Sequence, residues 1–177
     1  MATGVTPRDP KIPGQDHPKV LSYIEVLRDK KPVGRKVAVI GAGGIGFDVA
    51  EYLSQSGKSS ALDLPTWLAE WGVTDPAIAR GGLRAEPLPV HPSPRDISLL
   101  QRKAGKLGAG LGKTTGWIHR ASLKQRGVRF MGGVNYERIG DPGLQISDGE
   151  RRENLRWLEV DTVVLCAGQE SVRSLQP

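Results

Sequence analysis

The chain has 177 residues, of which 38% are hydrophobic and 25% charged, and its formal net charge is +6. This length supports one compact domain with a hydrophobic core, and this composition is typical of soluble globular proteins. The sequence contains no run of eighteen apolar residues, and its first residues lack the basic-then-apolar pattern of a signal peptide. The single cysteine, Cys166, excludes an internal disulfide and a cysteine-based metal site. We therefore expect a cytoplasmic protein that does not enter a membrane.

The first third of the chain predicts a lead-in, a helix, a strand and a second helix. Residues 1–17 are rich in proline, glycine and charge, which is typical of an extended segment. A helix is predicted over 18–30, where apolar residues recur at helical spacing: Val20, Leu21, Ile24 and Leu27. The apolar, β-branched run 36–40 predicts a buried parallel strand. A glycine-rich loop follows it, and 47–55 is predicted to be an amphipathic helix.

Residues 58–95 form a long connection of a different composition. A short helix is predicted at 63–71, with Trp67 and Trp71 on its apolar side and a proline in its first turn. The rest contains many prolines and glycines and is expected to be irregular. A connection of this length is usually functional or a docking surface, so we expect the two tryptophans to contact a partner.

The last part of the chain returns to alternating strands and helices. A strand is predicted over 97–100 and a helix over 115–126. Several strand candidates then follow in quick succession around an Asp148-Gly149 turn: 128–131, 134–139, 143–147, 155–160 and 162–166. This order predicts an α/β fold, in which a Rossmann-like parallel sheet is combined with an antiparallel β-meander.

The glycine loop is the strongest functional signal. Its sequence, Gly41-Ala42-Gly43-Gly44-Ile45-Gly46, has the G-x-G-x-x-G spacing and stands between a strand pattern and a helix pattern. Gly41 would permit a tight turn, Gly43 would let a pyrophosphate approach the backbone, and Gly46 would allow the helix to pack on the strand. The helix amides and dipole would then face the phosphates. A turn that only joins strand to helix is the alternative, but three spaced glycines favour a dinucleotide.

The choice between NADPH and NADH depends on which strand comes second. An acidic residue about 20 positions after the loop would bind the ribose 2′-hydroxyl of NAD, and Asp63 lies near that distance. The residues before Asp63 do not form a strand pattern, so it is assigned to a helix cap. If 97–100 is the second strand, it leads into Arg102 and Lys103, which suit a 2′-phosphate. The sequence favours NADPH, and a solvated strand end remains the alternative for these two cations.

Other candidate sites are weaker. The Gly112-Lys113-Thr114 segment lacks the spacing of a nucleotide-triphosphatase loop, and His17, His91 and His119 do not form a metal-ligand pattern. The densest basic stretch, 102–129, contains one aromatic residue, so nucleic-acid binding is not favoured. Asp48 lies one turn into the helix after the glycine loop. It could approach the cofactor or simply be a favourable acid near a helix N-terminus.

Four segments resemble bacterial NADPH-dependent 2,4-dienoyl-CoA reductases, and the resemblance extends from Ile12 to Glu170. The segments are the glycine loop, 100–104, 110–120 and 166–170. The resemblance implies an enzyme of unsaturated fatty acid β-oxidation with an FMN-containing barrel, a 4Fe-4S cluster, an FAD domain and an NADP domain. Electrons would pass from NADPH to FAD, and through the cluster to FMN and the dienoyl thioester. Ser171 departs from the pattern, which commonly has proline after Glu170.

The resemblance also implies a domain organisation, because the NADP domain of such reductases is inserted into the FAD domain. Residues 1–17 would be the lead-in from the FAD domain, 18–170 the NAD(P)-binding domain with its 58–95 insertion, and 171–177 the return segment. By position, the cofactor would be bound by Gly41, Ala42, Gly43, Gly44, Ile45, Gly46, Asp48, Arg102, Lys103, Ala167 and Gly168. One cysteine cannot hold a four-iron cluster, so we expect a fragment that binds NADPH and is not catalytic alone. The FAD domain of the same protein would be its partner, although a stand-alone regulatory module that binds a dinucleotide remains the alternative.

Overall fold

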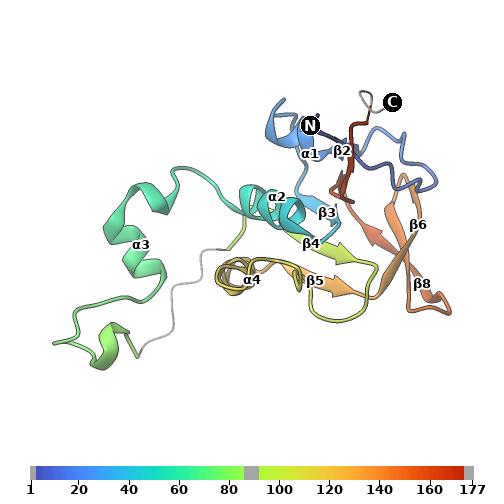
Figure 1. Cartoon of the computed structure of the whole chain (residues 1–177). Helices are drawn as coiled ribbons and strands as arrows, with labels where there is room; N and C mark the ends of the chain where they lie inside the picture. The colour runs from blue at the N-terminus through green and yellow to red at the C-terminus, as the bar shows by residue number, and fades with distance from the viewer. Residues whose placement is uncertain (1–2, 86–91, 174–177) are drawn as a thin grey trace.

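The computed structural model describes residues 3–85 and 92–173, so His91 lies outside the described residues. Its centre is a five-stranded sheet in the order β2-β9-β3-β4-β5 (Figure 1), and every neighbouring pair is parallel. The strands are β2 (Val20–Ser22), β3 (Lys36–Ile40), β4 (Asp96–Gln101), β5 (Arg129–Gly132) and β9 (Thr162–Leu165). The predicted α/β class with a parallel sheet is confirmed.

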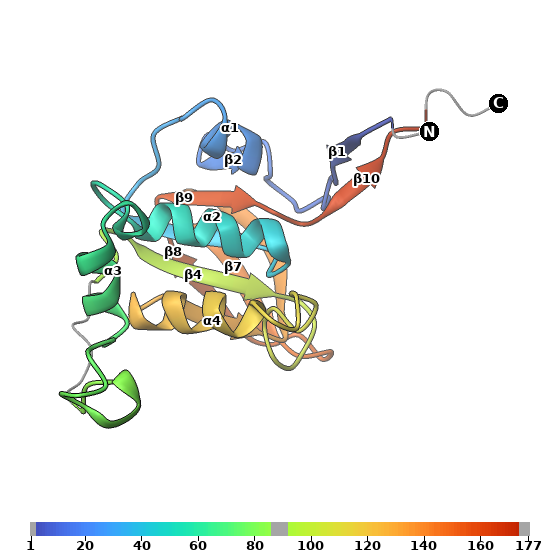
Figure 2. The same ribbon diagram turned by 60° about the vertical axis from the view of Figure 1, so that its left-hand side comes forward.

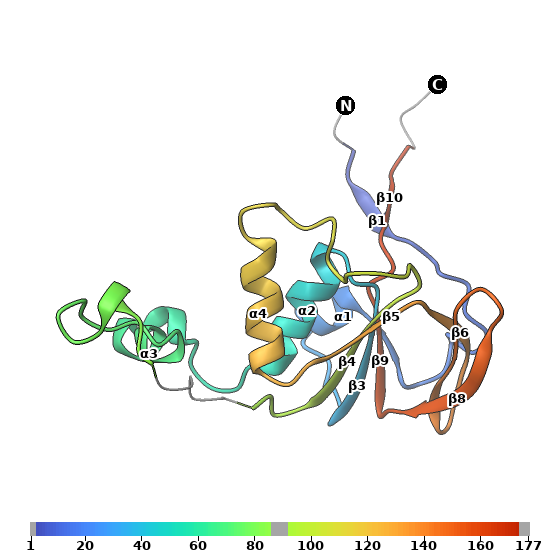
Figure 3. The same cartoon turned by 90° about the horizontal axis from the view of Figure 1, so that it is seen from below.

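Helices cover one face of this sheet, and a smaller sheet covers the other (Figure 3). The helices are α1 (Tyr23–Leu27), α2 (Gly44–Ser54) and α4 (Gly116–Gln125). The second sheet is the predicted meander, with antiparallel strands β6 (Val134–Gly140), β7 (Gly143–Asp148) and β8 (Glu153–Glu159). Because both faces of the parallel sheet are covered, its strands need apolar residues at successive positions.

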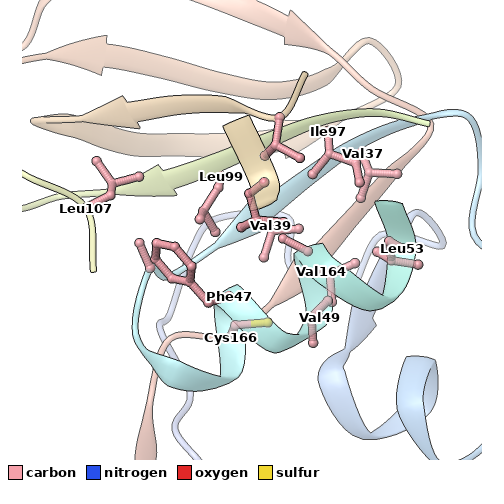
Figure 4. Close-up of a cluster of buried hydrophobic side chains, with 14 of the residues drawn as sticks. Val37, Val39, Phe47, Val49, Leu53, Ile97, Leu99, Leu107, Val164 and Cys166 are labelled. Carbon is pink, nitrogen blue, oxygen red and sulfur yellow. The ribbon is translucent and has the colours of Figure 1, made fainter. Parts of the chain in front are cut away.

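Strand β3 shows how one apolar run serves two cores. Val37 and Val39 belong to the cluster under the helices, whereas Ala38 and Ile40 belong to the cluster under the meander. Figure 4 shows the first cluster, in which Phe47 and neighbouring residues of α2 lie against side chains of the strands. Successive side chains of a strand point to opposite faces, so this alternation fixes the register of β3 in the sheet.

The two ends of the chain leave together. β1 (Val5–Pro7) and β10 (Gln169–Ser171) form an antiparallel pair in which Thr6 lies opposite Glu170. Figure 2 shows this pair extending away from the body of the domain. The chain therefore enters and leaves the domain through two neighbouring strands.

The helix predicted over 18–30 is wrong. Its first part is strand β2, which pairs with β9 along the edge of the sheet, and only residues 23–27 are helical. Ser22 is the reason for the change of structure: its Oγ accepts a hydrogen bond from the Glu25 amide (3.2 Å), and the Glu25 carboxylate accepts one from the Ser22 amide (2.8 Å). This capping box starts the helix at Tyr23. Helix α2 also differs from the prediction, since it begins at Gly44, within the glycine loop.

The long insertion forms an arm beside the domain (Figure 1). It contains α3 (Leu64–Glu70) and two short 3₁₀ helices, Ser60–Leu62 and Arg80–Gly82. Asp63 is the N-cap residue of α3, as predicted, and therefore does not end a strand. Trp67 is 40% exposed and lies 6.3 Å from Trp71, ring centre to ring centre, so the prediction that they contact a partner keeps its basis. In the described part of the chain, no helix has the length and apolar character needed to cross a bilayer.

Candidate dinucleotide site

The glycine loop lies where the ends of three parallel strands meet. It follows β3, whose neighbours are β4 on one side and β9 on the other. The Gly41 amide donates to the Leu100 carbonyl of β4 (2.9 Å), and the Cys166 amide donates to the Ile40 carbonyl (2.8 Å). The chain leaves β3 toward β4 and returns to its other side through β9, so this is a topological switch point. Ligands of open α/β sheets bind in the crevice at such a point.

Two of the loop glycines are required by close backbone packing. Gly41 has φ +109°, and a Cβ there would lie 2.2 Å from the Cys166 carbonyl oxygen. A Cβ on Gly46 would lie 1.7 Å from the Gly41 carbonyl oxygen. No side chain fits at these distances, so the two positions hold α2 against the ends of β3 and β9. This is the close helix–strand packing that the spacing predicts.

Gly43 and Gly44 have a different environment. Both are exposed, and a Cβ on either would meet no atom within 4 Å. Gly43 is the N-cap residue of α2 and supplies no side-chain cap. Among the described residues, no acceptor binds the amides of Gly44 and Ile45. A helix N-terminus with free amides and open space above them is suited to an anion such as a pyrophosphate.

The position of α2 is fixed by its buried face. Phe47 is 1% exposed and makes an edge-to-face contact with Phe130 of β5, with ring centres 5.8 Å apart. Figure 4 shows that Phe47 lies among the strand side chains and that Val49 and Leu53 continue this face along the helix. Asp48 lies on the opposite, exposed side of α2 and has no hydrogen-bond or ion-pair partner within the described ranges. Its predicted role beside the cofactor stays a prediction.

Arg102 and Lys103 directly follow β4, so 97–100 is within the second strand of the βαβ unit, as the sequence favours. The Gln101 side-chain amide donates to the Lys103 carbonyl (2.7 Å), which holds this turn. Both cations are exposed, and neither forms an ion pair with a described carboxylate. Their chemistry fits a 2′-phosphate, and their assignment to that group remains a prediction.

A cavity of about 300 Å³ beside Arg102 was missed by sequence reasoning. It lies between residues 10–13 and the meander, and its wall includes Tyr136. The Tyr136 hydroxyl is buried without a described hydrogen-bond partner. Burial raises the pKa of Tyr136, and the nearby Arg102 guanidinium opposes that rise. Arg152, on the same wall, is neutralised by Glu137 (2.9 Å). No local sequence pattern brings these distant segments together, so only the tertiary fold shows the cavity.

The segment that follows β9 lies at the same edge of the parallel sheet as the glycine loop. Ala167 and Gly168 follow Cys166, and Gly168 has φ +102°. The Gly168 carbonyl accepts a hydrogen bond from the Arg8 amide (3.0 Å), which connects this end of the sheet to the β1–β10 pair. Burial raises the pKa of the Cys166 thiol to about 12, so this group is an inert core residue.

His17 and His119, the histidines in the described part of the chain, each lie beside one carboxylate. His17 lies 3.1 Å from Asp141, and His119 lies 3.1 Å from Glu51. Within residues 3–85 and 92–173, no three metal-ligating side chains are gathered.

The strand order places residues 41–46, 102–103 and 167–168 at one edge of the parallel sheet, because they follow β3, β4 and β9. These are the segments that the sequence singled out.

Comparison with known proteins identifies a family and several proteins of similar sequence or structure. The model of the pyridine nucleotide-disulphide oxidoreductase family matches residues 1–176. The chain is 25% identical over 175 residues to a metal reductase from Desulforamulus reducens, a match that covers 99% of this chain and 24% of that protein. The structure of a 2-naphthoyl-CoA reductase complex with 2-naphthoyl-CoA aligns with a TM-score of 0.66 and 23% identity, over 96% of this chain and 20% of that one. An engineered water-forming NADPH oxidase bound to NADPH aligns with a TM-score of 0.54 and 22% identity, over 96% of this chain and 30% of that one.

The chain thus spans 24% of the length of the metal reductase and 20% of the naphthoyl-CoA reductase chain. The structural neighbours share the fold of this chain. Because the family model matches nearly every residue, the chain belongs to the pyridine nucleotide-disulphide oxidoreductase family.

Proposed function

We propose that this chain is the NADPH-binding domain of a flavin-dependent oxidoreductase and that it presents the cofactor to an FAD held by another domain of the same polypeptide. The observation that supports this most strongly is the open N-terminus of α2. Gly43 and Gly44 leave space above free amides, while Gly41 and Gly46 are fixed by backbone contacts. This is the geometry that a pyrophosphate needs, so the residues present fit the cofactor.

The chain's own residues would bind and orient the cofactor. The amides of Gly44 and Ile45 would donate to the pyrophosphate, and Arg102 and Lys103 would bind the 2′-phosphate that distinguishes NADPH from NADH. Ala167 and Gly168 would border the nicotinamide end, with Asp48 on the adjoining helix. Bound NADPH would supply a hydride to the flavin.

The wider enzyme is proposed on the resemblance to 2,4-dienoyl-CoA reductases. The matching segments, above all 110–120, support a cytoplasmic reductase of unsaturated acyl thioesters that contains FAD, FMN and a 4Fe-4S cluster outside this chain. The structural similarity to a 2-naphthoyl-CoA reductase agrees with a CoA thioester substrate. The paired strands β1 and β10 are suited to joining an FAD domain, because they extend together away from the body of this domain.

Affinity measurements on the isolated chain test this proposal. Calorimetric titration should give tighter binding of NADPH than of NADH. The double variant Arg102→Gln/Lys103→Gln should lose affinity for NADPH selectively, by about 1.5–3 kcal/mol for each charged hydrogen bond that is lost. Arg35→Gln is a matched control, because Arg35 is an exposed cation that directly precedes β3, at the opposite end of this strand from the glycine loop. Equal binding of the two nucleotides, or no binding of either, would contradict the assignment.

A further inference from the structure

The cavity beside Arg102 lies toward the other face of the parallel sheet from the glycine loop and α2. Its volume is about 300 Å³, and residues 10–13 and the first part of β6 line it. β6 belongs to the meander, which covers the face opposite to α2 (Figure 3). Arg102 and Ala167 line the cavity at the carboxyl edge of the sheet, because they come shortly after β4 and β9. The cavity is therefore a different space from the open N-terminus of α2.

A β-bulge brings successive side chains of β6 to this cavity. Neighbouring residues of a regular strand point to opposite faces, yet Asn135, Tyr136 and Glu137 all line the same space. The pairing of β6 with β7 shifts between Tyr136 and Arg138, which leaves Glu137 as the extra residue. Bulges redirect side chains and are frequent beside functional sites. The meander is thus irregular at the position where it borders the cavity.

Two cations reach the cavity from an unusual backbone conformation. Lys11 has φ +51° and Arg152 has φ +53°, and they are two of the four non-glycine residues with positive φ in the described part of the chain. Both line the cavity, one from the lead-in and one from the turn between β7 and β8. Non-glycine residues seldom adopt this conformation, and those that do are concentrated at ligand sites.

The cavity also has an excess of positive charge. Lys11, Arg102 and Arg152 line it, and Glu137 is the single carboxylate among its described lining residues. The Glu137 carboxylate already binds Arg152 (2.9 Å) and accepts a hydrogen bond from the Ser147 hydroxyl (2.6 Å). Lys11 and Arg102 form no ion pair with a described carboxylate. Two cations therefore remain to attract an anion.

The Tyr136 hydroxyl is a suitable hydrogen-bond donor for that anion. It is buried without a partner among the described residues, although a buried polar group normally has one. Burial raises the pKa of Tyr136, so the phenol stays protonated and can donate. The Arg102 guanidinium is near enough to oppose that rise, so both groups can act on one ligand. An acceptor placed between them would give the hydroxyl its missing partner.

The lead-in adds an apolar part to the lining. Pro10, Ile12 and Pro13 come from this segment. Ile12 is buried in the cluster between the sheet and the meander, and its amide donates to the Gln15 side chain (3.0 Å), so the segment is held in place. The cavity volume is at the lower end of the range of about 300–1,000 Å³ for small-molecule pockets. A ligand with one anionic group and a small apolar body therefore fits better than a bare ion.

We propose that this cavity binds a small organic carboxylate, with its carboxylate between Tyr136 and Arg102 and its apolar body against the prolines of the lead-in. The Tyr136 hydroxyl donates one hydrogen bond, the planar Arg102 guanidinium matches the two carboxylate oxygens, and Lys11 adds a second positive charge. The consequence for NADPH rests on the proposed function. Arg102 serves both ligands, so a bound carboxylate lowers the affinity of the chain for NADPH.

The experiment titrates the ¹⁵N-labelled chain with benzoate, with its uncharged counterpart benzamide and with inorganic phosphate as a bare oxyanion. The amide resonances of Ile12, Asn135 and Tyr136 should shift saturably with benzoate and not with benzamide, and phosphate should bind roughly tenfold more weakly than benzoate. Tyr136→Phe should weaken benzoate by about tenfold without lowering the urea midpoint of unfolding, because the hydroxyl has no internal partner to lose. Lys11→Gln should weaken benzoate several-fold, whereas Arg35→Gln, a matched change beside the amino end of β3, should not.

The outcomes separate this inference from the proposed function. Benzoate should weaken the binding of NADPH and not that of NADH, which has no 2′-phosphate. If NADPH binds and benzoate causes no saturable shift at the cavity, the inference fails and the proposed function stands. If benzoate binds as expected and NADPH does not bind, the carboxylate site stands and the proposed function fails.

Three results would overturn particular parts of the inference. Equal binding of benzamide or of phosphate would contradict an organic carboxylate as the ligand. Unchanged benzoate affinity in a folded Tyr136→Phe would contradict the role of the hydroxyl. NADPH binding that is unaffected by saturating benzoate would contradict the shared use of Arg102.

Discussion

Gly43→Ala should weaken NADPH binding with little loss of stability, whereas Gly46→Ala should destabilise the fold, although the two glycines are three residues apart in one loop. At Gly43 a Cβ would enter open space, and the backbone there is in the extended region that any residue adopts. Alanine is a poorer N-cap residue than glycine, so we expect Gly43→Ala to lower the free energy of unfolding by less than about 1 kcal/mol. The new methyl group would occupy the space above the helix amides and would keep the pyrophosphate away from them.

At Gly46 the Cβ would lie 1.7 Å from the Gly41 carbonyl oxygen, so the two backbone segments would have to separate by more than about 1 Å. The Gly41 carbonyl oxygen cannot move away easily, because Gly41 itself is packed against the Cys166 carbonyl. The cost should therefore reach or exceed the upper end of the range of about 1–3 kcal/mol for overpacked cores. Gly46→Ala should lose binding because the loop no longer folds correctly.

Urea unfolding and calorimetric NADPH titration measure the two effects separately. Gly43→Ala should unfold close to the wild-type midpoint and bind NADPH on the order of 10- to 100-fold more weakly, since one charge-assisted hydrogen bond contributes about 1.5–3 kcal/mol. Gly46→Ala should unfold at clearly lower urea. Normal NADPH binding by a folded Gly43→Ala would refute the placement of the pyrophosphate. Wild-type stability of Gly46→Ala would refute the packing argument.

Three further predictions concern the scaffold. The hydrogen bond from Lys31, aided by the Ser22 amide, lowers the pKa of Glu25 from 4.5 to about 2. This carboxylate should therefore stabilise the fold above pH 4.5 and lose its contribution as the pH falls toward 2. Glu25→Gln should make the free energy of unfolding depend less on pH across that window. Cys166, with its pKa raised to about 12, should react with a thiol reagent in urea but not in the native protein, and rapid native labelling would contradict its burial. Phe47→Ala should lower the free energy of unfolding by about 3–5 kcal/mol, measured in urea, and a loss below about 1 kcal/mol would mean that α2 is not anchored as described.

The central part of the fold could be predicted because its signals are local. The β-branched run 36–40, the glycine spacing after it and the apolar run 162–166 each correspond to one element in a βαβ arrangement. Asp63 could be assigned to a helix cap because no strand pattern precedes it, and this left 97–100 as the second strand. The gathering of three predicted segments at one edge then follows from parallel strand order alone.

The remaining features depend on tertiary contacts or on a competing local signal. The apolar spacing of residues 18–30 favours a helix, but β9 offers a free edge that pairs with Val20–Ser22, and the capping box at Ser22 delays the helix. That Ser-x-x-Glu pattern was present in the sequence and could have corrected the prediction. A groove beside α4 is lined in part by Trp117 and Lys124, whose helical spacing could have been seen in the sequence, but its other walls come from β5 and the loop after β4. Tyr136 shows no sequence signal for its buried hydroxyl.

The central claim is that NADPH binds with its pyrophosphate at the N-terminus of α2. The most direct measurement is a titration of the ¹⁵N-labelled chain with NADPH, followed by the backbone amide resonances of Gly43, Gly44 and Ile45. We predict that these resonances shift saturably with NADPH, that Arg102 and Lys103 shift less with NADH, and that Lys36, at the opposite end of β3 from the glycine loop, does not shift with either. Saturable shifts confined to other parts of the chain, or no shift at Gly44 and Ile45 at saturating NADPH, would contradict the claim.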